Sequence, residues 1–147
     1  MTCALLTYRG AVYPWHCDHM GHMNVMWYVG KFDEATWHLF LELGLTPEFL
    51  RESKRGMAAV EQHITYEREL HAGDVVTIYS SVLEVKEKSI RFQHKMRNDA
   101  AAEVAARTTL KGVYIDTVAR KSCAFPPAVI DTARRLIAGR AAHDAVS

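Results

Sequence analysis

The apolar pattern between Val25 and Leu43 constrains the fold more than any other feature of the chain. Apolar residues recur there at steps of three and four, while charged residues occupy the opposite face. Asn24 suits the N-cap position, and Gly44 suits the residue just past the C-terminal end. The pattern therefore predicts one long amphipathic helix over residues 25–43, and its apolar stripe needs a partner layer.

Strand-like segments flank this helix. Residues 5–13 predict a first strand that ends at Pro14, and an alternation of apolar and polar residues predicts a strand over residues 60–70. The β-rich run over residues 75–85 and the alternation over residues 90–97 predict two more strands. Residues 101–111 mix an alanine-rich helical composition with β-branched residues, and we predict a strand there because the hairpin order continues.

The C-terminal part predicts a second helix. Pro126-Pro127 introduces an amphipathic segment that reaches about residue 138, and we expect the polar tail over about residues 139–147 to be flexible. One strand, a long helix and four successive strands predict a single α+β domain over residues 1–147. In such a domain an antiparallel sheet packs on the helix.

The composition favours a small-molecule ligand. With 18 basic and 17 acidic residues the formal net charge is +1, and no run of like charges indicates nucleic acid or a membrane surface as a partner. Cys3, Cys17 and Cys123 are widely spaced, which disfavours a disulfide framework and a thiolate metal site. Since no leader-like segment or stretch of ~18 apolar residues occurs, we expect a cytoplasmic protein.

A lone carboxylate, Asp18, precedes the predicted helix start. Free N–H groups at a helix N-terminus favour an ionised carboxylate and supply donors for an oxyanion. Together they form a candidate site for acyl transfer. In the alternative interpretation, Asp18 only bonds turn amides, as loop aspartates commonly do.

Histidines around Asp18 allow a metal interpretation as well. His16, His19 and His22, with Cys17, have spacing that permits a zinc or iron site. No H-E-x-x-H pattern or second cysteine cluster accompanies them, so we expect neither a metal nor a cofactor, and His22 instead to orient the loop. No G-x-S-x-G or phosphate-cradling glycine motif occurs.

Large aromatic residues gather around Asp18 in the sequence: Trp15, Trp27, Tyr28, Phe32 and Trp37. We expect most of them in the core, with one or two lining an acyl pocket. The three tryptophans suit a short acyl group with a quaternary ammonium, held by cation–π contacts. Aromatic and medium-chain acyl groups stay open as alternatives.

The run Asp18-His19-Met20-Gly21-His22-Met23-Asn24, continued by Tyr28, Phe32 and Asp33-Glu34-Ala35, resembles the signature of the 4-hydroxybenzoyl-CoA thioesterase-like family of hot-dog-fold acyl-CoA thioesterases. Segments 64–70, 73–74, 89–92 and 113–116 look like the later strands of that family, so the likeness covers about residues 8–128. Many relatives have a second asparagine where this chain has Val25.

This resemblance implies a hot-dog fold, in which a curved antiparallel sheet wraps a long central helix. It implies a homodimer or homotetramer with active sites at the subunit interface, and acyl-CoA thioester hydrolysis with Asp18 as nucleophile or general base. The implied substrate contacts are His22, Asn24 and Tyr28, and the candidate cations for the CoA phosphates are Arg68, Lys88, Arg91 and Lys95.

Other functions stay open on the sequence. A hot-dog chain that only binds acyl groups or CoA, or that serves assembly, is one alternative, because fold alone does not fix function. Dehydration of a hydroxyacyl-CoA, known in other hot-dog branches, and a metalloenzyme are two more.

Overall fold

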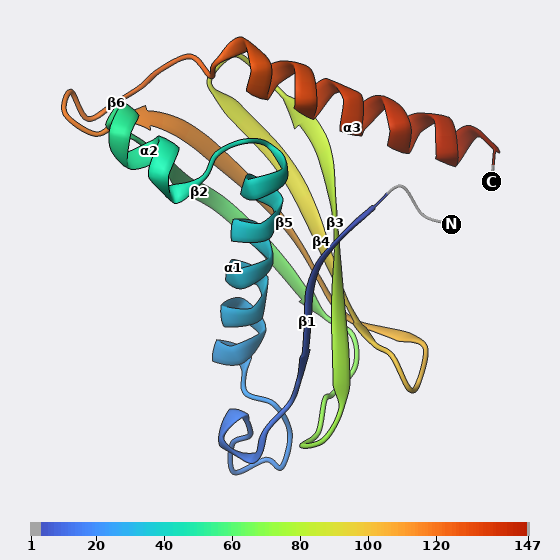
Figure 1. Cartoon of the computed structure of the whole chain (residues 1–147). Coiled ribbons are helices and arrows are strands. Elements are labelled where there is room, and N and C mark those ends of the chain that lie inside the picture. The colour runs from blue at the N-terminus through green and yellow to red at the C-terminus, as the bar shows by residue number, and fades with distance from the viewer. Residues whose placement is uncertain (1–3, 147) are drawn as a thin grey trace.

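The computed structural model describes residues 4–146, with side chains as far as residue 140. In chain order its elements are β1 (Leu5–Ala11), η1 (Pro14–His16), α1 (Val25–Glu42), α2 (Pro47–Ser53), β2 (Arg55–Tyr66), β3 (Val75–Val85), β4 (Ser89–Asn98), β5 (Glu103–Asp116), β6 (Lys121–Ser122) and α3 (Pro127–Val146). The strands pair antiparallel in one sheet of order β1-β3-β4-β5-β2, and β6 pairs with β5. The sheet curves around α1 (Figure 1), which confirms the predicted α+β class.

α1 packs its apolar face into the concave side of the sheet. Tyr28, Phe32, Ala35 and Leu39 recur at steps of three and four along the helix, and all four are buried. Each large side chain buried in this way stabilises the fold by about 1.5–3 kcal/mol. The two core clusters that include them also contain inward-facing strand residues, among them Val76, Ile78, Phe92, Met96 and Leu110.

A buried polar chain ties α1 to the sheet inside this core. The imidazole of His94 is completely buried between two hydroxyls, with Nδ1 2.5 Å from Ser80 Oγ and Nε2 2.8 Å from Thr36 Oγ1. Thr36 Oγ1 also donates to the carbonyl of Phe32, so the chain of polar contacts continues into the backbone of α1. Burial lowers the pKa of His94 to about 3 and keeps the ring neutral.

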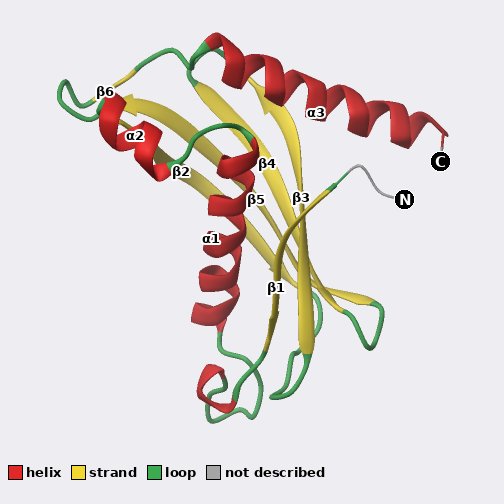
Figure 2. Ribbon diagram, viewed as in Figure 1, coloured by secondary structure: helices red, strands yellow, loops and turns green. Residues whose placement is uncertain are grey.

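The other helices close one end of the molecule. α3 lies across that end, in contact with β3, and brings Val129 and Ala133 into the core beside the last turn of α1 (Figure 2). α2 follows α1 directly and leads into β2. Among the described helices, none is long and apolar enough to cross a membrane.

Most predicted elements are confirmed, and several boundaries are corrected. α1 matches the predicted helix, with Asn24 as its N-cap and Gly44 in a left-handed conformation at φ +83°. The segment with mixed composition is strand β5, because β4 and β2 bond it on both sides. β2 runs over residues 55–66 instead of 60–70, and β1 ends at residue 11 instead of 13.

The predicted end of the last helix at residue 138 was wrong. α3 continues to Val146, so the tail expected after residue 138 is helical over its described part, and residue 147 lies outside the described residues. The sequence analysis also missed η1 and α2. Both are short, and each begins at a proline that follows a loop.

Candidate active site

Asp18 lies in a loop that folds back on itself before α1. Cys17 and Met23 form an isolated antiparallel bridge, and the N–H of Asp18 donates to the carbonyl of His22 at 3.1 Å. Gly21 turns the loop with φ +84°, a left-handed conformation that glycine adopts without strain. The loop therefore returns the chain to the helix start and leaves Asp18 beside it.

Both oxygens of the Asp18 carboxylate accept hydrogen bonds. Asn24 Nδ2 donates to Oδ2 at 2.9 Å, and the N–H of Met20 donates to Oδ1 at 2.9 Å. These two bonds, the Asn24 bond foremost, lower the pKa of Asp18 below its ordinary value, and the nearby His22 has a smaller effect in the same direction. The carboxylate is thus ionised at neutral pH.

Asn24 also organises the first turn of α1. Its Oδ1 accepts the N–H of Met26 at 3.0 Å, and its carbonyl accepts the N–H of Trp27 at 3.0 Å. Within the described part of the chain, the N–H of Val25 has no acceptor. A free backbone donor therefore stands at the positive end of the helix, next to the residue that holds Asp18.

An aromatic surface adjoins this loop. His16 is buried against Trp27, with ring centroids 4.5 Å apart, and burial lowers the pKa of His16, so its ring is neutral at neutral pH. Tyr13 and Trp15 stack in parallel at 4.6 Å and stay about half and two-thirds exposed.

The expectation that most aromatic residues near Asp18 lie in the core is right for Tyr28 and Phe32, which are buried. Trp15 and Trp37 lie outside the core, at 66% and 48% exposed. Trp27 is half-buried. Beside the loop of Asp18, the exposed indole of Trp15 is therefore available for a ligand.

Of the other predicted site residues, His22 belongs to the loop and Tyr28 lies in the first turn of α1, whereas the side chain of Arg68 makes its contact elsewhere. His22 has Nδ1 3.3 Å from the carbonyl of Met23 and Nε2 3.7 Å from Glu69 Oε1. Tyr28 is buried, its hydroxyl donates to the carbonyl of Arg68 at 3.1 Å, and burial raises its pKa to about 12. The Arg68 side chain faces Glu103 at 3.5 Å.

Arg91 lies at the other end of α1. It follows Ile90 and precedes Phe92, whose ring contacts Phe40 near the C-terminal end of the helix. Its guanidinium is 3.8 Å from Glu61 on the outer face of the sheet. The structure thus does not bring Arg91 to Asp18.

Potential metal ligands do not converge within the described residues. No group of three or more His, Cys, Asp and Glu side chains there has the arrangement of a metal site. His16 instead uses Nδ1 to accept the N–H of Tyr13 at 3.0 Å.

A groove of about 160 Å³ runs between α1 and strands β2 and β5. Val29, Asp33 and Trp37 line it from α1 at steps of four residues, and Met57 and Gln62 line it from β2. We call it the α1 groove. The sequence analysis missed it, although one signal was present: the apolar and aromatic residues of α1 extend over a wider face than one sheet layer covers.

The model of the thioesterase-like superfamily matches residues 12–132. The chain belongs to the thioesterase-like superfamily. This thioesterase-like chain is 29% identical over 113 residues to an L-carnitine dehydrogenase/betainyl-CoA thioesterase of Agrobacterium fabrum. That match takes in 77% of this chain, which spans only about a quarter, 23%, of the relative's length.

Solved structures share the fold. A hypothetical protein from Staphylococcus aureus, solved in complex with CoA, superposes with a TM-score of 0.87 at 20% identity, over 95% of this chain and 88% of that one. A gentisyl-coenzyme A thioesterase superposes with a TM-score of 0.76 at 27% identity, over 86% of this chain and 98% of that one. These likenesses confirm the hot-dog fold.

The two roles of Asn24 are separable by substitution. In Asn24→Ser the hydroxyl still caps α1, but the amide donor to Asp18 is lost. Because that bond is the largest cause of the lowered pKa of Asp18, we expect the pKa to rise toward its ordinary value. NMR titration of the carboxyl carbon measures this, and the acidic limb of any activity that needs the ionised carboxylate should move to higher pH.

Asn24→Ala serves as the comparison variant. It removes the cap as well as the donor, so we expect a further loss of about 1 kcal/mol in the free energy of unfolding. An unchanged pKa of Asp18 in Asn24→Ser would contradict the assignment of the Asn24 bond as its main determinant.

Proposed function

We propose that this chain hydrolyses acyl-CoA thioesters and that Asp18 is the catalytic carboxylate. The observation that carries the proposal is the placement of an ionised, partly exposed Asp18 beside the free N–H of Val25 at the start of α1. Membership of the thioesterase-like superfamily and the likeness to CoA thioesterases support it.

The reaction needs few protein groups. Asp18 either takes a proton from water as the water attacks the thioester carbon, or attacks that carbon itself and forms an anhydride that water then opens. The developing oxyanion would accept the N–H of Val25, and one such donor is worth about 3–4 kcal/mol in the transition state. The thiolate of CoA leaves without a strong acid, because thiols have pKa values near ~8.5.

A backbone donor also explains how the proposed site tolerates valine at position 25. Its N–H does not depend on the side chain, so the departure from the second asparagine of many relatives leaves the proposed oxyanion contact intact. In this proposal the amide of Asn24 orients the Asp18 carboxylate, the carbonyl of His22 holds the Asp18 N–H, and Tyr28 keeps the first turn of α1 against the chain at Arg68.

Replacement of Asp18 by Asn keeps the size and removes the charge. We expect Asp18→Asn to lower kcat for acyl-CoA hydrolysis by roughly 10²–10⁴, because an amide is neither base nor nucleophile here. Release of free thiol measures the rate, and Cys17→Ser, a neighbouring half-buried substitution, is the control.

Full activity in Asp18→Asn would refute the role of Asp18. Tight CoA binding by the wild-type chain without thiol release from a broad acyl panel would favour the non-catalytic module instead. A single turnover in ¹⁸O water identifies the nucleophilic route when water opens the anhydride at the carboxyl carbon of Asp18: the first product is then unlabelled and the label is found on Asp18, whereas general-base catalysis labels the product and leaves Asp18 unlabelled.

For the acyl group we propose a short cationic one, such as betainyl. The similar Agrobacterium protein is named for betainyl-CoA, and aromatic rings surround the loop of Asp18 here. Trp27 lies within the first turn of α1 with its ring tilted by 46° against that of His16, and the exposed Trp15 contacts the same histidine edge-on. Such rings attract a trimethylammonium group through cation–π contacts.

Two isosteric substrates test this selectivity. Betainyl-CoA and 3,3-dimethylbutyryl-CoA differ mainly by a positive nitrogen in place of a carbon. A desolvated cation–π contact of about 2 kcal/mol predicts kcat/KM roughly thirty-fold higher for the betainyl ester, reduced in Trp27→Leu. Equal kcat/KM values for the two esters would exclude the cationic class while leaving thioester hydrolysis untouched.

We further propose a dimer formed through β2. This twelve-residue strand is a sheet edge, and Val60 and Tyr66 on it are 58% and 47% exposed. A long edge strand with exposed apolar side chains favours pairing with a second chain.

Light scattering tests the assembly. We expect twice the 16.6 kDa chain mass for the wild type and the single-chain mass for Val60→Lys, because a charge on the edge opposes strand pairing. Val118→Lys is a matched control, since Val118 is 71% exposed in the turn before β6. A fully active wild-type monomer would contradict the proposal.

A further inference from the structure

A second hollow adjoins the α1 groove at the point where α2 leads into β2. It measures about 450 Å³, and Trp37 and Met57 line both depressions, so the two meet at these side chains. Arg51, Lys54 and Arg55 also line it. We call it the basic hollow. No acidic side chain is among its lining residues in the described part of the chain.

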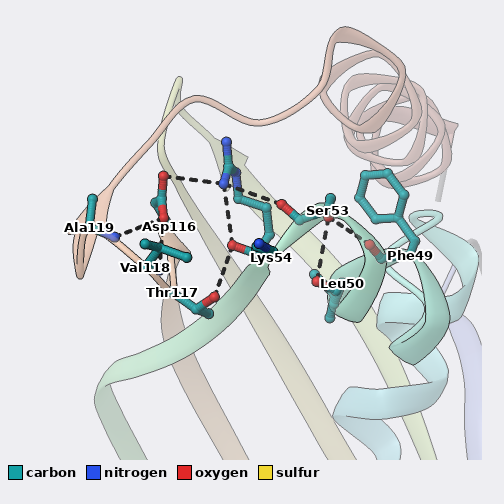
Figure 3. A network of polar contacts seen from close by, with 9 residues as sticks. Phe49, Leu50, Ser53, Lys54, Asp116, Thr117, Val118 and Ala119 are labelled. Atoms are coloured by element: carbon teal, nitrogen blue, oxygen red, sulfur yellow. Dashed lines mark hydrogen bonds and ion pairs between the residues drawn. The ribbon is translucent and has the colours of Figure 1, made fainter.

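The backbone under these cations is held in place. Lys54 has φ 55° and ψ 48°, a left-handed conformation that favours glycine or asparagine, yet the position carries a lysine. Its carbonyl accepts the N–H and the hydroxyl of Thr117, at 3.1 and 3.0 Å, and the guanidinium of Arg55 at 3.2 Å (Figure 3). The Lys54 side chain therefore projects from a fixed point.

Arg55 is oriented from the other side of the same network. Its guanidinium lies 3.3 Å from Asp116 Oδ2, and Asp116 Oδ1 in turn accepts the N–H groups of Val118 and Ala119 at 2.9 and 3.0 Å (Figure 3). These two bonds, more than Arg55, lower the pKa of Asp116, so it stays ionised at neutral pH.

The other two cations are available. Among the described side chains, no carboxylate lies within ion-pair distance of Arg51 or Lys54, and both residues are exposed. Two unpaired cations beside an oriented arginine form a site for an anion with several charges, such as a set of phosphates. By contrast, Arg91 faces Glu61 and Lys86 faces Glu84.

The distance along the groove matches the arm of CoA. From Val29 to Phe40, the two ends of the α1 lining, eleven residues rise about 16 Å along the helix. The pantetheine arm has about thirteen bonds between sulfur and the first phosphorus, which at the pitch of an extended backbone reach roughly 15 Å. An extended arm that enters the groove at Val29 therefore spans it as far as Phe40, whose ring contacts Trp37, one of the two side chains shared with the basic hollow.

We infer that the basic hollow binds the phosphates of CoA through Arg51, Lys54 and Arg55, and that the α1 groove holds the pantetheine arm. This inference rests on the proposed acyl-CoA substrate. It places the phosphates on α2 and the start of β2 instead of on Arg68, Lys88, Arg91 and Lys95. Asp33 and Gln62 along the groove offer polar partners to the amides of the arm.

The test compares a full substrate with one that lacks the nucleotide. Arg51→Ala combined with Lys54→Gly removes the two unpaired cations, and glycine relieves the left-handed position, so the fold is retained. We expect KM for the acyl-CoA ester to rise at least roughly tenfold, kcat to change little, and KM for the matching pantetheine thioester to stay the same.

The double variant Lys88→Ala/Lys95→Ala is the matched control, because it removes the same charge from two other exposed lysines. We expect it to keep both KM values within about twofold, consistent with isolated surface cations. The inference is overturned if the Arg51/Lys54 variant keeps the wild-type KM for the acyl-CoA ester, or if its KM rises equally for the acyl-CoA ester and the pantetheine thioester. It is also overturned if the KM for the acyl-CoA ester alone rises in the lysine control variant.

Equilibrium binding keeps this test separate from catalysis. Titration with adenosine 3′,5′-bisphosphate should show binding to the wild type and to Asp18→Asn, at least roughly tenfold weaker binding to the Arg51/Lys54 variant, and a dependence on salt. If no thioester is hydrolysed but this pattern holds, the proposed function fails and the phosphate site stands. A changed oligomeric mass in the Arg51/Lys54 variant would show that a second copy covers the hollow, and would overturn the inference.

Discussion

The side chain of Asn24 joins two parts of the molecule that would otherwise be independent. Its carbonyl oxygen starts α1, and its amide holds the carboxylate of Asp18, so the helix and the candidate catalytic group share one anchor. The core that fixes α1 therefore also fixes Asp18. Loop residues are mobile unless something positions them, and here an eighteen-residue helix with a buried face does so.

The position of α1 within the sheet depends on polar as well as apolar contacts. His94 links Ser80 on β3 to Thr36 on α1, and Lys31 donates to the hydroxyl of Tyr8 at 2.8 Å and to the carbonyl of Ala11 at 3.3 Å. Apolar packing alone tolerates small shifts of a helix against a sheet, whereas hydrogen bonds between buried groups require one arrangement. The register of α1 against β1 and β3 is thus set by paired polar atoms.

The sequence predicted what depends on neighbours along the chain. The helix from Val25 follows from a local repeat with a cap at Asn24, and Asp18 was found because it stands a few residues before that cap. The α1 groove and the basic hollow were not predictable in this way. Val29 and Trp37 on the helix meet Met57 on β2 only after the sheet has curved, and no local pattern encodes that meeting.

The cations proposed for the CoA phosphates were likewise not predictable from local sequence patterns. Lys95 attracts attention in the sequence because it lies on a regular strand alternation, whereas Arg51 and Lys54 lie on the short α2 and its cap. Thr117 holds the Lys54 carbonyl and Asp116 holds the Arg55 guanidinium, and both partners come more than sixty residues later in the chain. Long-range pairing of this kind is what a single sequence conceals.

The separation of the two charged regions has a physical consequence for a CoA ester. α1 is about 27 Å long, and the screening length at physiological ionic strength is about 8 Å. An ionised Asp18 at one end of the helix thus does not repel phosphates held at the other. The same carboxylate attracts a cationic acyl group at close range. A substrate with a positive acyl end and a negative nucleotide end therefore matches a negative group at the start of α1 and positive groups beyond its end. It would bind in one direction only.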